Sequence, residues 1–500
     1  MFYTVLDFLE NTAKKYPDKI AFADVNTSVT WKEFVNNAKN ISTVITKYYA
    51  PGTAVPVMAD KTVNTLEIFF GALYSGCFYT YVEPSFPDLR IESMLKTLDA
   101  SYIVSDTKFN NKLEAQKINI LPIDSFNEQF TNYSDKRRQN IIDTDPVYAN
   151  FTSGSTGNPK AVLVSHKNVI DFISCFVETF DIQYSENIAN QAPLDFDVSV
   201  KDIFSAVFTG ASVHLIPKMF FSFPTKLLDY LIEREITTLI WAVSALCIIS
   251  TLDGFSYKIP TKLKKIMFSG EVMPIKHLLI WKKNLPDVTY INLYGPTEIT
   301  CNCTYHILHK DIIENTKIPI GIPFKNERVF LLDENDELIT QDNTIGELCV
   351  SGSCVTLGYY NNPEKTNEVF IQNPIEKKRF ERIYKTGDLA KYGRDGLLYY
   401  CGRKDFQIKL NGHRIELTEV EGAMMGIETI TRCCCIFENE KVTAFYTGKE
   451  IEKKDIIKYL RTCLPSHMIP ADFIYLKEFA LNKNGKIDRN QLKGMLNDWL

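Results

Sequence analysis

Apolar and polar positions alternate along most of the chain in two patterns, one typical of buried strands and one typical of helices with a single buried face. Short apolar runs predict strands at Ala54–Met58, Tyr102–Val104 and Val213–Ile216. Apolar residues three and four apart predict helices, among others at Trp31–Thr46 and Leu227–Arg234. Strands and helices that alternate at this spacing indicate parallel-type β-sheets covered by helices, so we expect an α/β fold.

The pattern changes near residue 403. A glycine-rich hairpin pattern at Gly393–Tyr400 leads into the sequence Gly402-Arg403-Lys404-Asp405, and a compact section of strands and helices follows. We therefore expect a large N-terminal part, residues 1–403, that contains the parallel-type sheets. The remainder, residues 404–500, is predicted to form a small α+β C-terminal domain, because roughly 100 residues is a typical domain size.

Composition and charge are those of an ordinary globular protein, and they exclude several classes. Of the 500 residues, 45% are hydrophobic and 23% are charged, which excludes a disordered chain. The formal net charge of −5 argues against a nucleic-acid-binding surface. No apolar run is long enough for membrane insertion and the first residues lack the basic start of a signal peptide, so we expect a cytoplasmic protein. The 12 cysteines lack zinc-site spacing and are expected to be reduced thiols.

The strongest local motif is a polar loop at residues 151–160, FTSGSTGNPK, directly after an apolar stretch. Glycines let backbone N–H groups turn toward an anion, hydroxyl groups donate further hydrogen bonds, and Lys160 adds positive charge. These residue types are typical of a phosphate-binding loop, although the Gly-Lys-Ser/Thr ending of a Walker motif is absent from the sequence. A Ser/Gly surface loop is the structural alternative.

Four further motifs follow in order toward the C-terminus. They are residues 292–298 (NLYGPTE), 384–388 (YKTGD), 402–405 (GRKD) and 482–489 (NKNGKIDR). Taken singly, each has a structural explanation, because Gly-Pro, Thr-Gly-Asp and Asn-Gly sequences readily form tight turns. Taken together with the polar loop, they point to a single enzyme family.

The set resembles the adenylate-forming superfamily, which includes acyl-CoA synthetases, luciferases and peptide-synthetase adenylation domains, from about Leu9 to the C-terminus. The stand-alone D-alanine:carrier-protein ligases look most similar, on residues 190–193 (NQAP), 196–200 (FDVSV), 270–272 (GEV) and 405–409 (DFQIK). The resemblance implies that the protein adenylates an amino acid with ATP and transfers the aminoacyl group to the phosphopantetheine thiol of a carrier protein. No carrier domain follows Arg489 in this sequence, so we expect a carrier in trans. A monomer is the default expectation.

The resemblance also implies which residues bind ATP and Mg²⁺. Contacts to the phosphates and to adenosine would come from Thr152, Ser153, Thr156, Lys160, Asn292, Tyr294, Thr297, Asp388, Arg403 and Lys486. Glu298 would hold Mg²⁺, a hard cation that prefers carboxylate oxygen. Asp388 suits the two ribose hydroxyls because a carboxylate only accepts hydrogen bonds.

Lys486 is the implied catalytic residue, together with Thr297 and Glu298. When the substrate carboxylate attacks the α-phosphorus, negative charge gathers on both reactants, and a lysine between them stabilises that transition state. Asp405 would be the hinge about which a mobile C-terminal domain rotates between the two half-reactions. After that rotation, the loop at residues 409–413 would line a tunnel for the pantetheine arm.

The implied substrate pocket departs from that of the D-alanine ligases. Asp197 would pair with the α-ammonium group, and its structural alternative is a helix N-cap. The other implied pocket residues are Val198, Lys201, Trp241, Met267, Ser269, Leu293, Cys301 and Asn302. A buried Lys201 is costly without a negative partner, and that partner is either a side-chain carboxylate of the substrate or Asp197 four residues earlier. An acidic or polar amino acid and D-alanine are therefore both expected substrates.

Two other interpretations compete with amino-acid activation. An acyl- or aryl-CoA ligase of the same fold acts on substrates that lack an ammonium group to pair with Asp197. A degenerate carrier-docking protein without activity is the non-enzymatic alternative. Retention of Glu298, Asp388, Arg403 and Lys486 together argues against the latter, because a chain without catalytic demand has no reason to keep every polar group.

Overall fold

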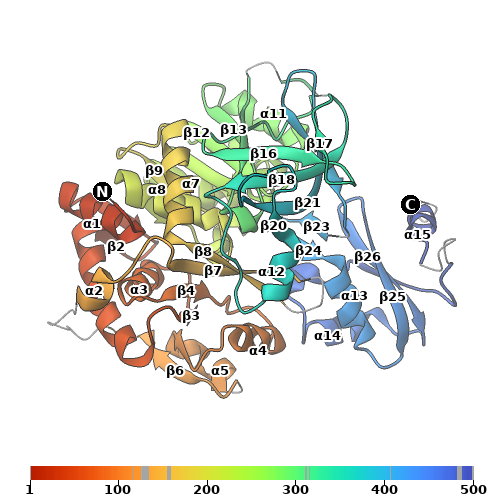
Figure 1. Ribbon diagram of the computed structural model, residues 1–500, viewed down its shortest axis with the longest axis horizontal. Coiled ribbons are helices and arrows are strands. Elements are labelled where there is room, and N and C mark those ends of the chain that lie inside the picture. Colours follow the sequence, from red (N-terminus) through yellow and green to blue (C-terminus); the bar gives the residue numbers. More distant parts are fainter. Residues whose placement is uncertain are drawn as a thin grey trace. The chain divides into compact units, whose positions relative to one another are not determined.

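The computed structural model describes residues 2–114, 116–123, 126, 135–154, 159–309, 312–314, 316–405, 407–480 and 487–497 (Figure 1). The chain folds into two compact units. The first contains residues 1–84, 98–150 and 161–404, and the second contains residues 85–97, 151–160 and 405–500. The rotation of residues 404–500 as a mobile domain stays a prediction.

The largest sheet in the described part of the chain has nine strands. In spatial order they are β15 (Ile322–Pro323), β14 (Thr304–Ile307), β13 (Thr289–Tyr294), β12 (Lys265–Ser269), β11 (Thr238–Ala242), β9 (Asn187–Asn190), β10 (Ser212–Leu215), β1 (Ile20–Ala23) and β2 (Ser28–Thr30). The six strands from β13 to β1 run parallel, and β2, β14 and β15 are antiparallel to their neighbours. The carboxyl ends of β9, β11, β12 and β13 therefore meet at one edge of the sheet.

A second sheet repeats the parallel arrangement. Its strands, in spatial order, are β19 (Gly358–Tyr359), β8 (Lys160–Ser165), β7 (Pro146–Thr152), β4 (Phe78–Tyr81), β3 (Ala54–Met58), β5 (Tyr102–Ser105) and β6 (Asn119–Pro122). The strands from β7 through β4, β3 and β5 to β6 pair in parallel, whereas β19 is antiparallel to β8. The α/β prediction is confirmed, and the strand predicted at residues 54–58 has the bounds of β3.

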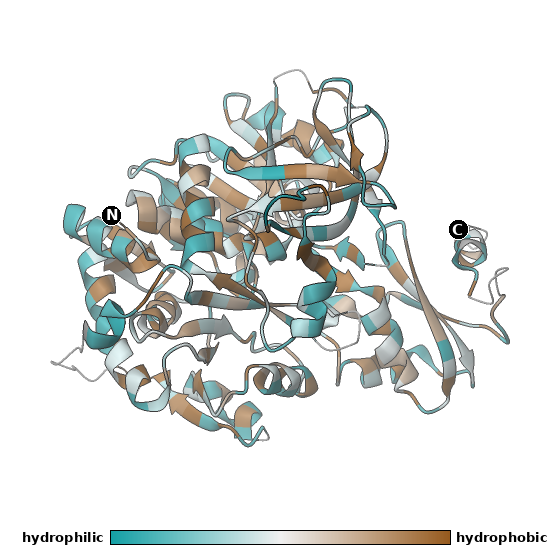
Figure 2. Cartoon of the chain, viewed as in Figure 1, coloured by the Kyte–Doolittle hydropathy of each residue, from teal (hydrophilic) through white to brown (hydrophobic). Residues whose placement is uncertain are grey.

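Helices with one apolar face cover these sheets, and the brown strands between partly teal helices show this pattern in Figure 2. The helices of the first unit are α1 (Val5–Lys15), α2 (Trp31–Tyr48), α3 (Val63–Tyr74), α5 (Asn110–Glu114), α6 (Asp135–Gln139), α7 (His166–Thr179), α8 (Val198–Thr209), α9 (Pro224–Glu233), α10 (Val243–Thr251), α11 (Ile275–Asn284) and α12 (Pro363–Val369). Local chemistry sets the boundaries: α2 begins after Thr30, whose hydroxyl accepts from the Glu33 amide at 3.3 Å. None of the described helices is long and apolar enough to cross a membrane.

The parallel pattern that the sequence predicted up to residue 403 ends earlier, and residues 327–403 form a different kind of sheet. Six described strands there pair only in antiparallel fashion: β17 (Leu338–Ile339), β16 (Glu327–Leu332), β18 (Gly346–Gly352), β21 (Arg382–Tyr392), β20 (Phe370–Gln372) and β22 (Leu398–Arg403). The connections between β16 and β17 (residues 333–337) and between β21 and β22 (residues 393–397) are short hairpins, with no room for the crossover helix that a parallel pair needs. The β21–β22 register places Asp388 opposite Arg403.

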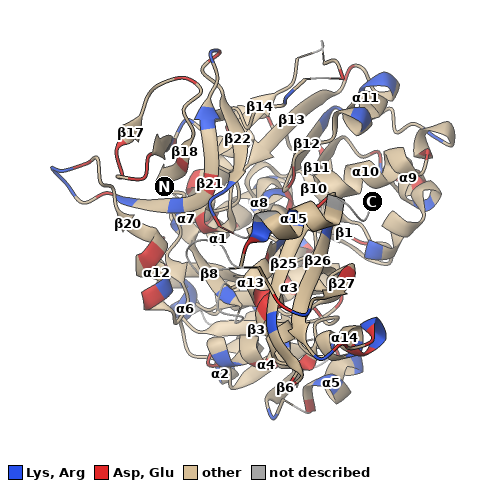
Figure 3. Cartoon of the chain, turned by 90° about the vertical axis from the view of Figure 1, so that its right-hand side faces the viewer, with Lys and Arg blue, Asp and Glu red and all other residues tan. Residues whose placement is uncertain are grey.

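The second unit combines small sheets with helices, as expected of an α+β domain (Figure 3). Its elements are α4 (Asp88–Thr97), β23 (Gln407–Leu410), β24 (His413–Glu416), α13 (Leu417–Met425), β25 (Ile430–Glu438), β26 (Lys441–Gly448), α14 (Lys453–Leu460), β27 (Asp472–Tyr475) and α15 (Arg489–Asn497). In Figure 3 the strands β25 and β26 are mostly tan, whereas α14 carries both acidic and basic residues. Strands β25 and β26 thus supply the apolar base of this unit, with charge on its helices.

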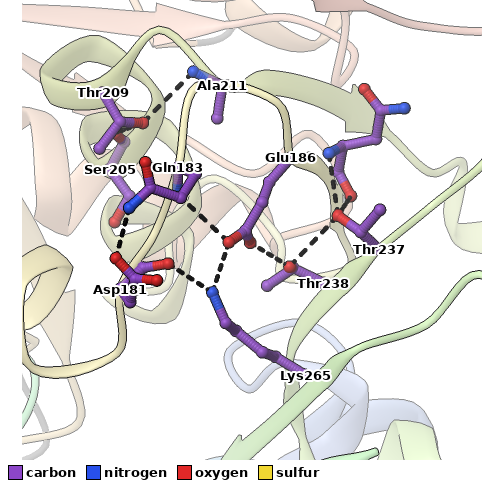
Figure 4. A network of polar contacts seen from close by, with 10 residues as sticks. Asp181, Gln183, Glu186, Ser205, Thr209, Ala211, Thr237, Thr238 and Lys265 are labelled. Carbon is purple, nitrogen blue, oxygen red and sulfur yellow. Dashed lines mark hydrogen bonds and ion pairs between the residues drawn. The ribbon is translucent and has the colours of Figure 1, made fainter.

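A polar network joins the amino ends of β9, β11 and β12 (Figure 4). The buried carboxylate of Glu186 accepts hydrogen bonds from Lys265 and Thr238, and from the Gln183 amide at 3.2 Å. Lys265 also donates to the Asp181 carbonyl at 2.6 Å. Because ligands of such sheets bind at the opposite, carboxyl edge, we interpret this network as structural.

Candidate active site

The predicted amino-acid site lies at the carboxyl edge of the nine-stranded sheet. Parallel pairing places Ala242 beside Ser269 at the ends of β11 and β12, and Phe268 beside Asn292 on β13. The loops that follow these strand ends therefore lie side by side. The structure brings together side chains that the sequence spreads over about a hundred residues.

The loop after β13 is tightly folded. A Cβ atom on Gly295 would lie 2.5 Å from both the Cα of Asn302 and the carbonyl oxygen of Cys301, so only glycine fits there. Thr300 and Cys301 have φ values of +59° and +82°, a conformation that costs a non-glycine residue free energy. Strain of this kind persists where the surrounding contacts hold it, here at Cys301, which is predicted to line the site, and at Thr300 beside it.

Cys301 fastens this loop to the start of α8. Burial raises the pKa of its thiol well above the usual value, so the group is a neutral S–H. That S–H donates to the carbonyl oxygen of Asp197 at 2.7 Å. The contact fixes the backbone from which the Asp197 carboxylate extends.

Asp197 occupies the N-cap position of α8, but its side chain makes no cap hydrogen bond. The side chains of Asp197 and Val198 are both partly exposed, in contrast to the buried residues 199–201 that follow them. The side chain of Asp197 therefore does not act as the cap of α8.

Lys201 is buried one turn further along α8, with 1% of its surface exposed. Its ammonium group donates to the Asn302 side-chain oxygen at 2.8 Å and to the Ser269 hydroxyl at 3.3 Å. Burial lowers the pKa of Lys201, and the charges of Asp197 and Asp202 oppose that change. Three of the predicted pocket residues thus form one polar group beside Asp197.

Met267 and Leu293 lie on the same face of the sheet as α8, because both belong to the apolar cluster that contains Val200 and Ile203 of that helix. Trp241 lies on the opposite face, in the cluster formed with α9 and α10. Its indole N–H donates to the Ala189 carbonyl at 2.8 Å, and its ring contacts Phe221 with centroids 5.3 Å apart. The predicted pocket role of Trp241 is therefore corrected.

The error arose from the two-residue period of strands, since shifting a strand by one residue exchanges its faces. Ala242, which pairs with Ser269 on the parallel neighbour, lies on the face where Trp241 had been expected. A single chain carries no signal for this register, which appears only once β11 pairs with β12.

We expect the substitution Trp241→Phe to lower stability without changing which amino acid is activated. The change removes the indole hydrogen bond to the buried Ala189 carbonyl, at a cost of about 0.5–1.5 kcal/mol. Urea denaturation and a substrate panel measured on the same preparation test this. A changed substrate preference at normal stability would return Trp241 to the pocket.

The predicted adenosine-binding residues converge at the junction of β13 and β21. The Tyr294 hydroxyl donates to one carboxylate oxygen of Asp388, and Arg403 contacts the other at 2.7 Å. Asp388 is 1% exposed. A carboxylate has about four acceptor sites, so two remain for ribose hydroxyls. The Asn292 side-chain N–H₂ donates to the Pro319 carbonyl at 2.8 Å, which orients its amide.

Glu298 is fully buried in the short helical turn Thr297–Ile299. Its carboxylate accepts a hydrogen bond from the Tyr359 hydroxyl at 2.8 Å, and Thr297 beside it is partly exposed. Tyr359 was not singled out from the sequence, because an isolated Gly-Tyr pair has no motif. Its place on β19 brings it to Glu298 only in the folded chain.

The phosphate-loop residues belong to the second unit. The Gly154 amide donates to the carboxylate of Glu419 at 3.1 Å, and the Ser153 hydroxyl donates to the Arg414 carbonyl at 3.0 Å. The buried Thr152 hydroxyl has no hydrogen-bond partner among the described residues. The Gly154 amide thus binds a carboxylate oxygen, whereas the Thr152 hydroxyl, two residues earlier, has no partner among the described residues.

Further predictions concern the remaining phosphate-loop residues, the catalytic lysine, the hinge and the loop at residues 409–413. Thr156 and Lys486 lie outside the described residues, and Lys160 begins β8. Asp405 is exposed and is the first residue after the break between the units, so its hinge role stays a prediction. Asn411 and Gly412 form the tight turn between β23 and β24, both with positive φ.

Comparisons with known proteins identify the family. The model of the AMP-binding enzymes matches residues 9–360. Zwittermicin A synthase ZmaJ of Bacillus cereus is 32% identical over 97% of this chain and 93% of its own length. The D-alanine--D-alanyl carrier protein ligase of Listeria monocytogenes is 29% identical over 99% of both chains. The chain belongs to the AMP-binding enzyme family.

The resemblance inferred from the motifs is therefore confirmed, and the chain is an adenylate-forming ligase of the peptide-synthetase and carrier-protein-ligase type. A solved structure supports the fold: PA1221, an NRPS protein with adenylation and PCP domains, has a TM-score of 0.84 at 24% identity, covering 99% of this chain and 84% of that one. Bacitracin synthase 1 of Bacillus licheniformis is 32% identical over 97% of this chain, which spans only 9% of that protein.

The residues present fit the substrate and metal ion that an AMP-binding enzyme uses. Asp388 keeps free acceptor sites for a ribose, and the unpartnered Thr152 hydroxyl suits a phosphate oxygen. Among the described residues no group of three or more His, Cys, Asp or Glu side chains is arranged to hold a metal ion. A single carboxylate such as that of Glu298 is enough for Mg²⁺, because that ion is usually held by one or two carboxylates together with substrate phosphates.

Proposed function

We propose that this protein activates an amino acid with ATP and then transfers the aminoacyl group to the phosphopantetheine thiol of a separate carrier protein. The observation that carries the proposal is Asp197, a partly exposed carboxylate at the N-cap position of α8 whose side chain makes no cap hydrogen bond. It lies beside the polar group of Lys201, Ser269 and Asn302. A carboxylate at this place suits the ammonium group of an amino acid.

In the first half-reaction, a carboxylate oxygen of the amino acid would form a bond to the α-phosphorus of ATP while the bond from that phosphorus to the pyrophosphate oxygen breaks. Asp197 would hold the α-ammonium group, so the substrate carboxylate points toward the nucleotide. Tyr294, Asn292, Asp388 and Arg403 would hold the adenosine. Mg²⁺, when bound at Glu298, neutralises negative charge on the phosphate oxygens.

Other side chains would stabilise the negative charge of the phosphates and of the transition state. Thr297 would donate to the α-phosphate, and Thr152, Ser153, Thr156 and Lys160 would hold the β- and γ-phosphates. Lys486 would neutralise the negative charge shared by the entering carboxylate and the α-phosphate.

In the second half-reaction, the carrier thiol would attack the carbonyl carbon of the aminoacyl-AMP. The thioester C–S bond forms, the bond to AMP breaks, and the thiol proton passes to solvent. AMP is a good leaving group, so little base catalysis is needed. The loop at residues 409–413, turned at Asn411 and Gly412, would line the path of the pantetheine arm. His413 in this loop stacks on His467 with ring centroids 3.6 Å apart, which supports a structural role.

Lys201 bears on which amino acid is activated. Its two hydrogen-bond acceptors in the described chain, Ser269 and Asn302, are neutral. A third N–H remains for a side-chain acceptor of the substrate. Because Asp197 and Asp202 already oppose the effect of burial, a substrate carboxylate is not required, and D-alanine stays a candidate beside an acidic or polar amino acid.

Pyrophosphate exchange with twenty L- and several D-amino acids tests the function and the substrate together. If the substrate is acidic, Lys201→Met is expected to lower exchange with it by about 30-fold or more, because a buried charge loses its partner. Lys19→Met is the matched control, since that lysine also donates to two neutral oxygens, of Gly210 and Ser212, away from the site. Exchange with D-alanine alone in the unaltered protein would contradict an acidic substrate.

A further inference from the structure

The segment that carries Lys486, residues 481–486, lies outside the described residues, but the chain on both sides of it is firmly held. The Asp488 amide donates to the Ala480 carbonyl at 2.9 Å. The side chain of Asp488 accepts from the Gln491 amide at 3.2 Å at the start of α15. The described residues on either side of the segment, Ala480 and Asp488, are therefore held together at one point of the second unit.

Arg489, three residues after Lys486, connects this point to two other elements. One guanidinium nitrogen donates to the Cys435 carbonyl on β25 at 2.6 Å, and the other contacts the Glu421 carboxylate on α13 at 2.7 Å. The same Glu421 oxygen accepts from the Cys435 amide at 2.7 Å. Arg489, Glu421 and Cys435 thus form a closed set of three hydrogen bonds, which we call the Arg489 clamp.

The Arg489 clamp binds the backbone N–H and C=O of Cys435, which point away from the neighbouring strand β26. In the described part of its sheet, β25 is an edge strand that pairs only with β26, where Cys435 lies opposite Ala444. The outward N–H and C=O of an edge strand need partners. Here the carboxylate of Glu421 and the guanidinium of Arg489 supply them, so the start of α15 is held in register with the strand.

Apolar packing holds α15 independently of the clamp. Leu492 and Phe479 are buried in one cluster with Cys434, Ile436 and Phe445 of β25 and β26. Arg489 and Glu421 retain 21% and 16% exposure of their side chains, so their pair is only partly desolvated. Loss of the clamp is therefore expected to shift the start of α15 rather than unfold the unit.

We propose that Glu421 and Arg489 are positioning residues for the adenylation half-reaction, and that they act by fixing the segment that carries Lys486. The inference rests on the proposed function, in which Lys486 acts only in the first half-reaction. A long side chain that must meet two reactants depends on where its backbone is held, and misplacement of about 1 Å can cost 10²-fold in rate. The second half-reaction has no such dependence, because Lys486 has left the site.

Glu421→Gln and Arg489→Met test the proposal, with Lys493→Gln as the matched control. Lys493 also lies on α15 and pairs with β25, through Glu438 at 3.6 Å, but both partners are exposed. Adenylation is measured by pyrophosphate exchange with the amino acid that gives the strongest signal in the unaltered protein. Transfer is measured separately, from chemically made aminoacyl-AMP of that amino acid to free pantetheine.

We expect both clamp variants to lose about 10- to 100-fold in the kcat of adenylation at unchanged KM, while transfer stays within about twofold. Lys493→Gln should match the unaltered protein in both half-reactions. Normal adenylation in both clamp variants would overturn the inference, and so would an equal loss in both half-reactions, which indicates general destabilisation.

A second measurement does not need activity. Trypsin cuts after lysine, and the segment contains Lys483 and Lys486. Glu421→Gln is expected to be cleaved there faster than the unaltered protein and than Lys493→Gln, at equal melting temperature. Equal cleavage rates would overturn the inference, whether or not the protein shows exchange with any amino acid. Absence of exchange with every amino acid would count separately, against the proposed function.

Discussion

Replacing Lys486 with alanine is expected to slow adenylation by about 10²–10³-fold while transfer from preformed aminoacyl-AMP continues at its normal rate. Removal of one group that stabilises developing negative charge in a transition state typically has an effect of this size. The charge appears only while the carboxylate and the α-phosphate react, so the effect belongs to kcat of the first half-reaction. Pyrophosphate exchange and single-turnover transfer to a pantetheine thiol measure the two steps separately.

Lys483→Ala is the appropriate control, because it removes a lysine from the same segment, three residues earlier. It should leave both steps unchanged. If Lys486→Ala adenylates its amino acid at the normal rate, the mechanism proposed for this protein is wrong, whatever the substrate.

Replacing Asp197 with asparagine is expected to abolish most amino-acid activation. The substitution keeps the shape of the side chain but removes the charge that would pair with the α-ammonium group. Truncating one partner of a desolvated charge pair costs about 2–5 kcal/mol, which corresponds to a loss of about 30-fold or more in kcat/KM. Exchange assays that titrate the amino acid at saturating ATP measure the loss.

The same variant separates amino-acid activation from the competing acyl- or aryl-CoA ligase. A carboxylic acid without an ammonium group has nothing to pair with Asp197, so its activation should be unaffected by Asp197→Asn. Asp181→Asn, at the opposite edge of the sheet, serves as a control because Asp181 accepts from Gln183 in the network of Figure 4. Activation of such a carboxylic acid at equal rates by the unaltered protein and by Asp197→Asn, with no activation of amino acids, would favour the acyl-CoA ligase.

The structure changes how the predicted pocket is understood at two places. Lys201, which the sequence left with two explanations, donates to Ser269 and Asn302, residues 68 and 101 positions away in the chain. Trp241 faces the other side of the sheet, where it packs and bonds as a core residue. Both differences depend on which face of a strand or helix packs against a neighbouring element. Pairing between segments far apart in the sequence determines that packing.

The local order of residues was sufficient for the family, the parallel sheets and most of the proposed roles. Glycine, hydroxyl and carboxylate residues in short motifs act together with neighbours a few positions away. Motifs such as NLYGPTE and YKTGD can therefore be recognised from the sequence alone. Strand periodicity likewise predicted β3 with the bounds it has.

Other features arise only when distant segments meet. The Tyr359–Glu298 bond, the closing of Asp388 between Tyr294 and Arg403, and the Arg489 clamp join residues that have no motif in common. The antiparallel sheet of residues 327–403 and the face on which Trp241 lies were decided in the same way. Each depends on strand register and helix packing, in which a shift of one residue exchanges the buried and exposed faces, and a single sequence does not encode such a choice locally.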